Sequence, residues 1–311
     1  MFKSTTLIFT VAIAFYVTPL HAQQPQGVNL AEMQDWNIVI ADDAIASEVY
    51  AAEEFQEFFC QASGLKLPIV HKITRWDKHV FIGPGKVMHA SPAGFSVEEL
   101  GPEDLHIVVR DNNIAIAGGQ PRGTLYGVYT FLEDYLGVRF LTHEHTHVPA
   151  VGDKRPTGPV DRVYRPPFVN YRNVGYEACY RVPVFGVRTR NNYHDQPRFG
   201  GMLPFGNIGH SFYRQVSSEN EKYGQDHPEY FALVGGKRKI GNQVTDELCL
   251  TNPEILPLVT DAVLREIGHP DSIGRRNFSV SRNDSIDGYC RCEPCIAIAD
   301  REESQMGPML D

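Results

Sequence analysis

The segment from Asn277 to Cys295 constrains the fold most strongly, because a strand pattern runs directly into three closely spaced cysteines. Phe278 and Val280 alternate with serines, which predicts a buried strand. Asn283 and Asp284 follow where that strand would end. Parallel barrels present reactive groups at the carboxyl ends of their strands, so an amide and a carboxylate at this point predict a functional site.

The cysteines of this segment admit two interpretations. Cys290, Cys292 and Cys295 are too close in sequence to pair freely with one another, and Cys249 precedes a predicted helix. If strand ends lie side by side, the four sulfurs converge, and one structural zinc ion with four cysteine ligands fits the spacing. Disulfides are the alternative, because an exported chain with six cysteines favours them.

The N-terminus has the pattern of a secretory signal peptide over residues 1–22. Lys3 is followed by an apolar run over residues 7–17 and by a cleavage site after Ala22. A membrane anchor is the alternative, but the run is short for a spanning helix, which needs about 20 apolar residues. We therefore expect a secreted or periplasmic protein that has no membrane association after cleavage. The net charge of −9 argues against a nucleic-acid partner.

The first domain, residues 23–150, combines strand patterns with two amphipathic helix patterns. Asp42 and Asp43 offer a helix N-cap, apolar residues recur at helical spacing over residues 45–59, and Gly64 ends the pattern. A second helix pattern runs from a glycine-rich turn to Gly137. The strand patterns occupy residues 36–41, 67–70, 79–82, 105–109 and 114–117, and a hairpin turn joins the last two. The order predicts a small mixed α/β sandwich with its helices on one side of a sheet.

The glycine-rich turn over residues 118–124 lacks the Walker lysine and the GxGxxG spacing. We therefore expect tight backbone geometry there rather than phosphate binding. The string GGQPRGTLYGVYTFLEDYLGVRFL, which begins at this turn, resembles the end of the small domain that precedes the catalytic barrel in bacterial α-glucuronidases and β-hexosaminidases. In those families the domain packs against the catalytic barrel and carries no catalytic residue. The resemblance therefore implies that a glycosidase-type barrel follows this domain in the chain.

The second half begins after a proline-containing stretch over residues 151–167, which predicts a linker. Residues 168–311 then alternate between strand and helix patterns, as a parallel barrel does. A closed (β/α)8 TIM-type barrel takes about 250 residues, so we expect only its front part here, and the chain to be an N-terminal fragment of a longer enzyme. One helix begins at Asn252 and Pro253 and ends at Gly268, and Pro257 within it is a local conflict.

Three strings in this half occur together: HPEYFALVGGKR, CLTNPE and SRND followed by DGYCRCEPC. They are similar to a large family of secreted bacterial proteins known as a domain of unknown function. Some of its members are grouped with glycoside hydrolases that act as endo-β-N-acetylglucosaminidases. The family usually has Gln-Asn-Asp-Gly where this chain has Arg-Asn-Asp-Ser at 282–285. The resemblance implies a glycan substrate that contains N-acetylhexosamine or uronic acid.

Glycoside hydrolysis uses two carboxyl groups, or one acid together with a participating substrate acetamide, and needs no cofactor. Asp284 is the catalytic candidate, and its alternative is a turn aspartate. The candidate substrate-binding residues offer fixed hydrogen-bond donors; they are Arg172, Arg188, Asn191, His210 and Asn283. For each of them a structural role in a loop or on the surface is the alternative. A second carboxyl is not identifiable, so a non-catalytic carbohydrate-binding or scaffold protein remains the other functional class.

Overall fold

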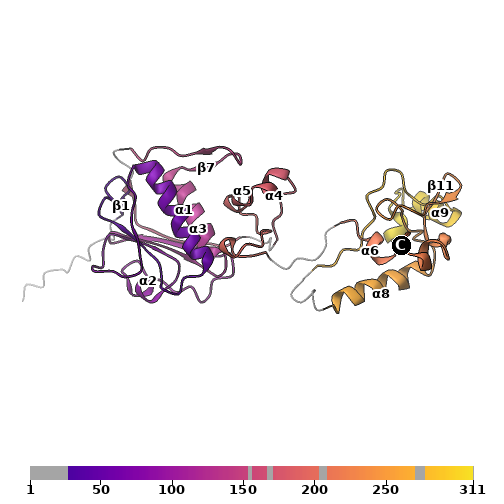
Figure 1. Cartoon of the computed structure of the whole chain (residues 1–311), viewed down its shortest axis with the longest axis horizontal. Coiled ribbons are helices and arrows are strands. Elements are labelled where there is room, and N and C mark those ends of the chain that lie inside the picture. Colours follow the sequence, from indigo (N-terminus) through magenta and orange to yellow (C-terminus); the bar gives the residue numbers. More distant parts are fainter. Residues whose placement is uncertain (1–26, 153–155, 167–170, 203–208, 270–276, 311) are drawn as a thin grey trace, which may run out of the picture. The chain divides into compact units, whose positions relative to one another are not determined.

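The computed structural model describes residues 27–152, 156–166, 171–202, 209–269 and 277–310. The chain divides into two compact units, unit 1 over residues 1–201 and unit 2 over residues 202–311 (Figure 1). The predicted signal peptide lies outside the described residues. Among the helices in the described ranges, none is long and apolar enough to cross a membrane.

Unit 1 is built on a six-stranded mixed sheet with the order β10-β5-β6-β4-β2-β3. β3, β2, β4 and β6 run parallel to one another, whereas β5 is antiparallel to both β6 and β10. The strands are β2 (Asn37–Val39), β3 (Ile69–Val70), β4 (His79–Ile82), β5 (Leu105–Arg110), β6 (Asn113–Gly118) and β10 (Val160–Tyr164). Two short pairs add to them: β1 (Val28–Asn29) with β9 (Pro156–Thr157), and β7 (Arg139–Phe140) with β8 (Thr146–His147).

The main core of unit 1 lies between the sheet and two helices, α1 (Ala46–Ser63) and α3 (Gly123–Phe131), the second of which continues as a π-helical turn to Leu136 (Figure 1). α1 buries Phe55 and Phe59 here at helical spacing, and Gly64 ends it with a left-handed φ of 76°, as predicted. The helix starts at Ala46, later than the predicted cap at Asp42.

The opposite face of the sheet carries a smaller core. Val39, Phe81 and Val108 alternate with residues of the main core and pack with Met88 of the short helix α2 (Lys86–Ala90). The prediction that helices cover one side is therefore incomplete, because α2 was not predicted.

The predicted hairpin is confirmed. β5 and β6 pair in register up to Arg110 and Asn113, which leaves a two-residue turn at Asp111 and Asn112. Both turn residues have positive φ, 49° and 53°, which is the backbone that a tight hairpin turn needs and that Asp and Asn tolerate.

The glycine-rich turn between β6 and α3 packs closely against a neighbouring loop, as the sequence indicated. A Cβ atom on Gly119 would lie 2.0 Å from the carbonyl oxygen of Gly101, and one on Gly123 would lie 2.2 Å from that of Asp104. No side chain larger than hydrogen fits at these two positions.

The predicted linker over residues 151–167 is not a linker throughout. Its residues Val160–Tyr164 form β10, the edge strand that pairs with β5. The carboxylate of Asp161 also reaches the side chains of His106 at 2.7 Å and Arg110 at 2.8 Å. The flanking prolines suggested a linker, but the short alternating segment between them completes the sheet.

Unit 1 continues past β10 into the region predicted to begin the barrel. α4 (Glu177–Arg181), α5 (Pro183–Arg188) and the 3-10 turn Pro197–Phe199 follow, and residues 171–174 are not a strand. The ring of Phe199 packs edge-on against Tyr50 of α1, with ring centroids 5.4 Å apart. The predicted first barrel strand at 168–174 is thus wrong for its described part.

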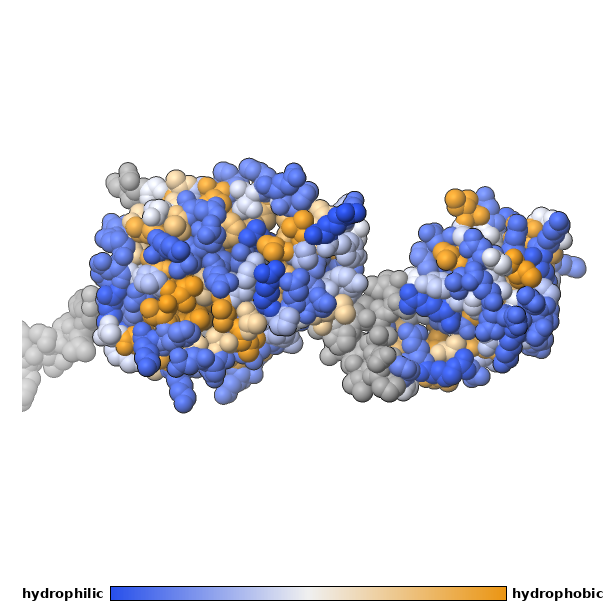
Figure 2. All heavy atoms as spheres, in the orientation of Figure 1, coloured by the Kyte–Doolittle hydropathy of each residue, from blue (hydrophilic) through white to orange (hydrophobic). Residues whose placement is uncertain are grey.

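Unit 2 consists mainly of short helices around a small core that includes Phe212, Phe231, Leu248 and Ile255. Its elements are α6 (Phe212–Gln215), α7 (Glu221–Gly224), the 3-10 turn Pro228–Tyr230, β11 (Leu233–Val234), β12 (Lys237–Arg238), α8 (Ile255–Ile267), α9 (Glu293–Arg301) and α10 (Gly307–Leu310). On the face shown in Figure 2, its apolar residues are scattered, whereas unit 1 shows a broader apolar patch.

The predicted barrel is not confirmed. Over the described part of unit 2, the only sheet is the antiparallel pair β11–β12, beside one isolated bridge between Phe231 and Leu248. The predicted strand from Asn277 to Ser281 is extended chain without a ladder, because the carbonyl of Ser281 accepts hydrogen bonds from the start of α6 instead. Val280, expected to be buried, is 44% exposed.

Pro257 does not conflict with its helix. α8 begins at Ile255, after the predicted cap, so Pro257 is the third helical residue. The first four N–H groups of a helix have no intrahelical acceptor, and the missing N–H of Pro257 therefore removes no helical hydrogen bond.

Candidate functional site

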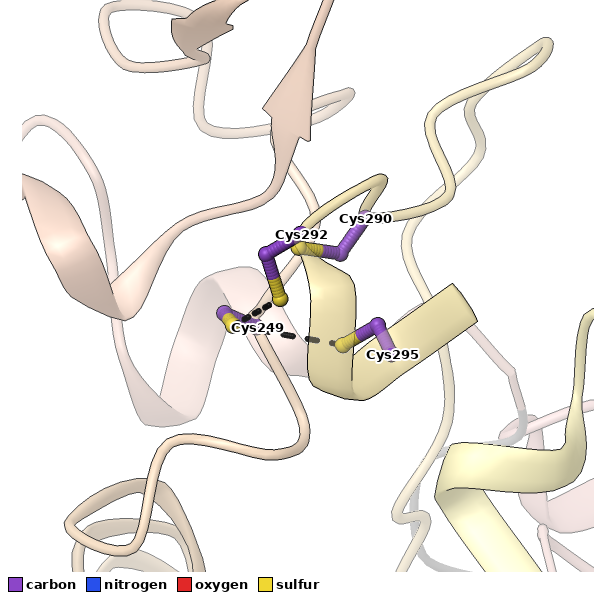
Figure 3. A group of neighbouring side chains, drawn as sticks. All are labelled: Cys249, Cys290, Cys292 and Cys295. Carbon is purple, nitrogen blue, oxygen red and sulfur yellow. Dashed lines mark hydrogen bonds between the residues drawn. The ribbon is translucent and has the colours of Figure 1, made fainter. Parts of the chain in front are cut away.

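The structure brings four of the six cysteines together in unit 2 (Figure 3). Cys249 directly follows Leu248, the residue that bridges to Phe231, and precedes α8. The other three come from one turn of chain: Cys290 lies in the loop before α9, Cys292 is the N-cap residue of α9, and Cys295 lies in its first turn. Two segments far apart in sequence therefore supply the cluster.

The four sulfur atoms all lie within 4.8 Å of one another. The sulfur of Cys249 is 3.6 Å from that of Cys292 and 4.0 Å from that of Cys295. Cys249 and Cys295 are each 3% exposed, so half of the cluster is closed to solvent.

Hydrogen-bond donors surround the sulfurs. The Leu233 N–H donates to the Cys290 sulfur at 3.3 Å, and the Arg238 guanidinium lies 3.9 Å from the same atom. The hydroxyl of Thr251 is 3.1 Å from the Cys295 sulfur. Hydrogen bonding from Cys290 and the other thiols lowers the pKa of Cys249 well below its usual value, and the contact with Cys249 raises the pKa of Cys295. The N–H, guanidinium and hydroxyl donors around the cluster would stabilise negative charge on its sulfurs.

Asn283, which directly precedes the catalytic candidate Asp284, is buried. Its side-chain oxygen accepts from the Tyr213 N–H at 2.9 Å, and its amide donates to the carbonyls of Asp246 at 2.6 Å and Gln243 at 3.2 Å. The Asn283 N–H donates to the Glu247 carboxylate at 3.3 Å. These contacts support the structural alternative for Asn283, since its amide is fully used within the fold.

Asp284 and His210 are the two predicted site residues whose side chains are exposed. They come from adjoining segments, because a ring nitrogen of His210 lies 3.1 Å from the carbonyl oxygen of Arg282. Arg282 itself stacks over the Tyr289 ring at 3.7 Å and pairs with Glu247 at 3.2 Å. The loop that carries Asp284 is therefore held by buried neighbours while its carboxylate faces solvent.

The other predicted binding residues belong to unit 1 and have partners within it. Arg188 makes a bidentate pair with Glu54 of α1, with both distances 2.8 Å. Arg172 donates to the Glu103 carboxylate at 2.5 Å. Asn191 is 3% exposed, and its side-chain oxygen accepts a hydrogen bond from the Val174 N–H. Their contacts support structural roles. Arg172 and Arg188 tie residues 171–201 to the rest of unit 1, and Asn191 orders that segment.

Glu103 is the residue that sequence reasoning missed in this region. Its carboxylate accepts from Arg122 at 2.8 Å and from Asn192 at 2.8 Å, in addition to Arg172. Arg122, which follows the glycine-rich turn residues Gly118 and Gly119, is 1% exposed and also donates to the carbonyl of Gly200. In sequence, Glu103 follows a Gly-Pro pair and has the pattern of an ordinary turn residue, so no local signal marks it.

A cavity of about 620 Å³ in unit 1 was also missed. It opens beyond the ends of β2 and β4, and the polar groups that line it include Asp42, Glu48, His71, Lys86 and Gln120. Glu48 is buried and accepts hydrogen bonds from Gln120 and from the Ile45 N–H, and its burial raises the pKa of its carboxyl. The sequence showed Asp42 only as a helix cap.

Two similar solved structures are mutant forms of a Streptomyces plicatus β-hexosaminidase in complex with the product GlcNAc. One is 13% identical with a TM-score of 0.32, and the match covers 76% of this chain and 41% of that chain. The other is 12% identical with a TM-score of 0.34, and covers 78% and 54% respectively. This chain therefore spans about half the length of these structures or less. A search of curated proteins gives no match.

A family model described as a domain of unknown function, DUF4838, matches residues 140–311. The match begins in unit 1 near β7 and includes all of unit 2, with the four cysteines and the loop of Asp284. Because it covers more than half of the 311 residues, the chain belongs to the DUF4838 family.

Proposed function

We propose that the chain is part of a secreted protein of the glycoside hydrolase type that acts on glycans containing N-acetylhexosamine or uronic acid. The observation that carries the proposal is the DUF4838 match, which includes the three strings that resemble a family some of whose members are grouped with glycoside hydrolases. Asp284 and His210 support the proposal, because both are exposed residues of unit 2.

The environment of Asp284 suits a positioned carboxylate. Its neighbour Asn283 is fixed by four hydrogen bonds, to Tyr213, Gln243, Asp246 and Glu247. A residue anchored in this way holds the backbone next to it, so the Asp284 carboxylate is presented without a buried partner to compete for it. An exposed carboxylate is an acceptor for sugar hydroxyls or for the N–H of a substrate acetamide.

His210 supplies a second exposed group in unit 2. Its backbone has a positive φ of 36°, and its ring is exposed apart from the contact with the Arg282 carbonyl. Because one ring nitrogen is engaged there, the other is available to a sugar hydroxyl. We assign His210 to substrate binding and Asp284 to orienting the acetamide or assisting the acid. The activity is proposed for the protein that contains this chain.

The test uses the full-length secreted protein with N-glycan, chitooligosaccharide and glucuronoxylan substrates. Asp284→Asn keeps the shape of the side chain and removes its charge, so we expect kcat to fall by about 100-fold or more on the substrate that is cleaved. His210→Asn retains a residue that tolerates positive φ and should mainly raise KM.

Asp287→Asn is the matched control, because Asp287 is exposed, lies three residues away and has a φ of 54° that Asn also adopts. Full turnover by Asp284→Asn would show that Asp284 has no catalytic role. If the unmodified protein binds one of these glycans and cleaves none, it is a carbohydrate-binding protein instead.

A further inference from the structure

We propose that Cys249, Cys290, Cys292 and Cys295 bind one zinc ion. The ion would join the segment that contains Cys249 to the segment at residues 290–295 within unit 2. This metal site is independent of the proposed activity on glycans and stands on the geometry of the four sulfurs.

The sulfur positions fit the corners of a zinc tetrahedron. A zinc–sulfur bond of about 2.3 Å gives a sulfur–sulfur edge of about 3.8 Å in tetrahedral coordination. The distances from the Cys249 sulfur to those of Cys292 and Cys295, 3.6 Å and 4.0 Å, lie on either side of that value. All four sulfurs lie within 4.8 Å of one another, so one ion reaches all of them after small side-chain shifts.

Disulfides fit this arrangement less well. A disulfide joins sulfurs in pairs about 2.05 Å apart. The Cys249 sulfur, however, approaches two partners at comparable distances (Figure 3), so pairing it with one would leave the other without its contact. One ion satisfies all four sulfurs at once.

The groups around the cluster are those that a thiolate site needs. Zinc with four thiolates carries a net charge of −2, which requires donors or cations nearby. The Leu233 N–H and the Arg238 guanidinium both face the Cys290 sulfur, at 3.3 Å and 3.9 Å. The Thr251 hydroxyl lies 3.1 Å from the Cys295 sulfur. Both strands of the β11–β12 hairpin therefore take part, because Leu233 of β11 and Arg238 of β12 face each other in its register.

The site is structural rather than catalytic. Four protein ligands leave no open position for water or substrate. Cys249 is followed by α8, and Cys292 and Cys295 form the N-terminal end of α9, so the ion would fix both helices relative to the hairpin. Unit 2 has a small apolar core and little sheet in its described residues, which is the situation in which a structural metal adds folding energy.

The first experiment is elemental analysis of the purified protein together with titration of its thiols. We expect one zinc per chain, and four thiols that react only after a chelator is added. A tetrathiolate site also suits iron, so iron in place of zinc would overturn the choice of metal. Absence of any metal together with absence of free thiols in unit 2 would overturn the site.

Cys292→Ser is expected to lose at least nine-tenths of the bound zinc, whereas Cys60→Ser, which alters a cysteine of α1 in unit 1, should keep it. Because Cys292→Ser could fail to fold, thermal unfolding of the unmodified protein with and without chelator gives an independent test. We expect the chelator to lower the midpoint of the unit 2 transition and leave that of unit 1 unchanged. Equal zinc content in Cys292→Ser and Cys60→Ser, or a chelator effect on unit 1 alone, would contradict the proposal.

Discussion

Glu103 is the acceptor at the centre of a buried ion-pair cluster in unit 1. The Glu103 side chain is only 9% exposed, and its carboxylate pairs with both Arg122 and Arg172. Arg122 is itself almost fully buried. Removing one member of a buried charge cluster leaves the others without compensation, which costs far more than the loss of a surface pair. Glu103 thus holds the turn before α3 and residues 171–201 on the same unit.

Glu103→Gln should lower the free energy of unfolding of unit 1 by about 3–5 kcal/mol, because both arginines would keep their charge without the carboxylate. Urea unfolding followed by circular dichroism measures this change. Glu99→Gln, at an exposed position four residues earlier, is the control and should change stability by less than about 0.5 kcal/mol. Similar values for the two variants would mean that the cluster contributes little.

At the scale of residues, the sequence identified residues that matter more readily than it identified the residues they contact. It singled out four cysteines that the structure places together, and it named Arg172 as a hydrogen-bond donor without identifying the residue that accepts from it. The partner, Glu103, lies 69 residues away, and the partner of Arg188 lies 134 residues away. Pairings of this kind depend on the tertiary fold, so no local pattern reveals them. The contacts of Asn283 were hidden for the same reason, since its acceptors come from residues 243–246.

At the scale of elements, local signals worked where periodicity and a terminator coincided. α1 has a helical apolar stripe and ends at Gly64, and β5–β6 has two alternating runs around an Asp-Asn turn. The segment at 277–281 also alternates, but its backbone bonds to the start of α6, so alternation alone did not make it a strand. β10 was missed because prolines on either side obscured a five-residue edge strand.

The β5–β6 turn gives a direct test of this element-scale reasoning. Asn112 has a φ of 53°, a conformation that glycine adopts without cost and that a β-branched residue resists. We expect Asn112→Gly to keep or slightly raise stability and Asn112→Val to lower it by about 1–2 kcal/mol. Thermal unfolding of the two variants separates these outcomes, and a Val variant as stable as the Gly variant would refute the two-residue turn.

At the scale of the whole molecule, the unit boundary lies later than the sequence indicated. Composition placed it in the proline-containing stretch 151–167, whereas β10 and residues 171–201 belong to unit 1. The reason is that Arg172 pairs with Glu103 and Arg188 pairs with Glu54. These ion pairs hold residues 171–201 to the rest of unit 1, although the stretch before them has the composition of a linker.

Limited proteolysis should therefore release an N-terminal fragment that ends near residue 201 and retains β10. Mass spectrometry of the fragments locates the cut to the residue. A stable fragment that ends before Val160 would instead support the boundary that composition suggested, and would place β10 outside the folded unit.

The zinc site proposed for the four cysteines is the central claim about unit 2, and the zinc K-edge X-ray absorption spectrum of the purified protein tests it most directly. We predict a first shell of four sulfur atoms at about 2.3 Å, with no oxygen or nitrogen ligand. The Cys60→Ser variant should give the same spectrum. A first shell with oxygen or nitrogen ligands, or a protein that carries no zinc and holds these cysteines as disulfides, would contradict the four-cysteine centre.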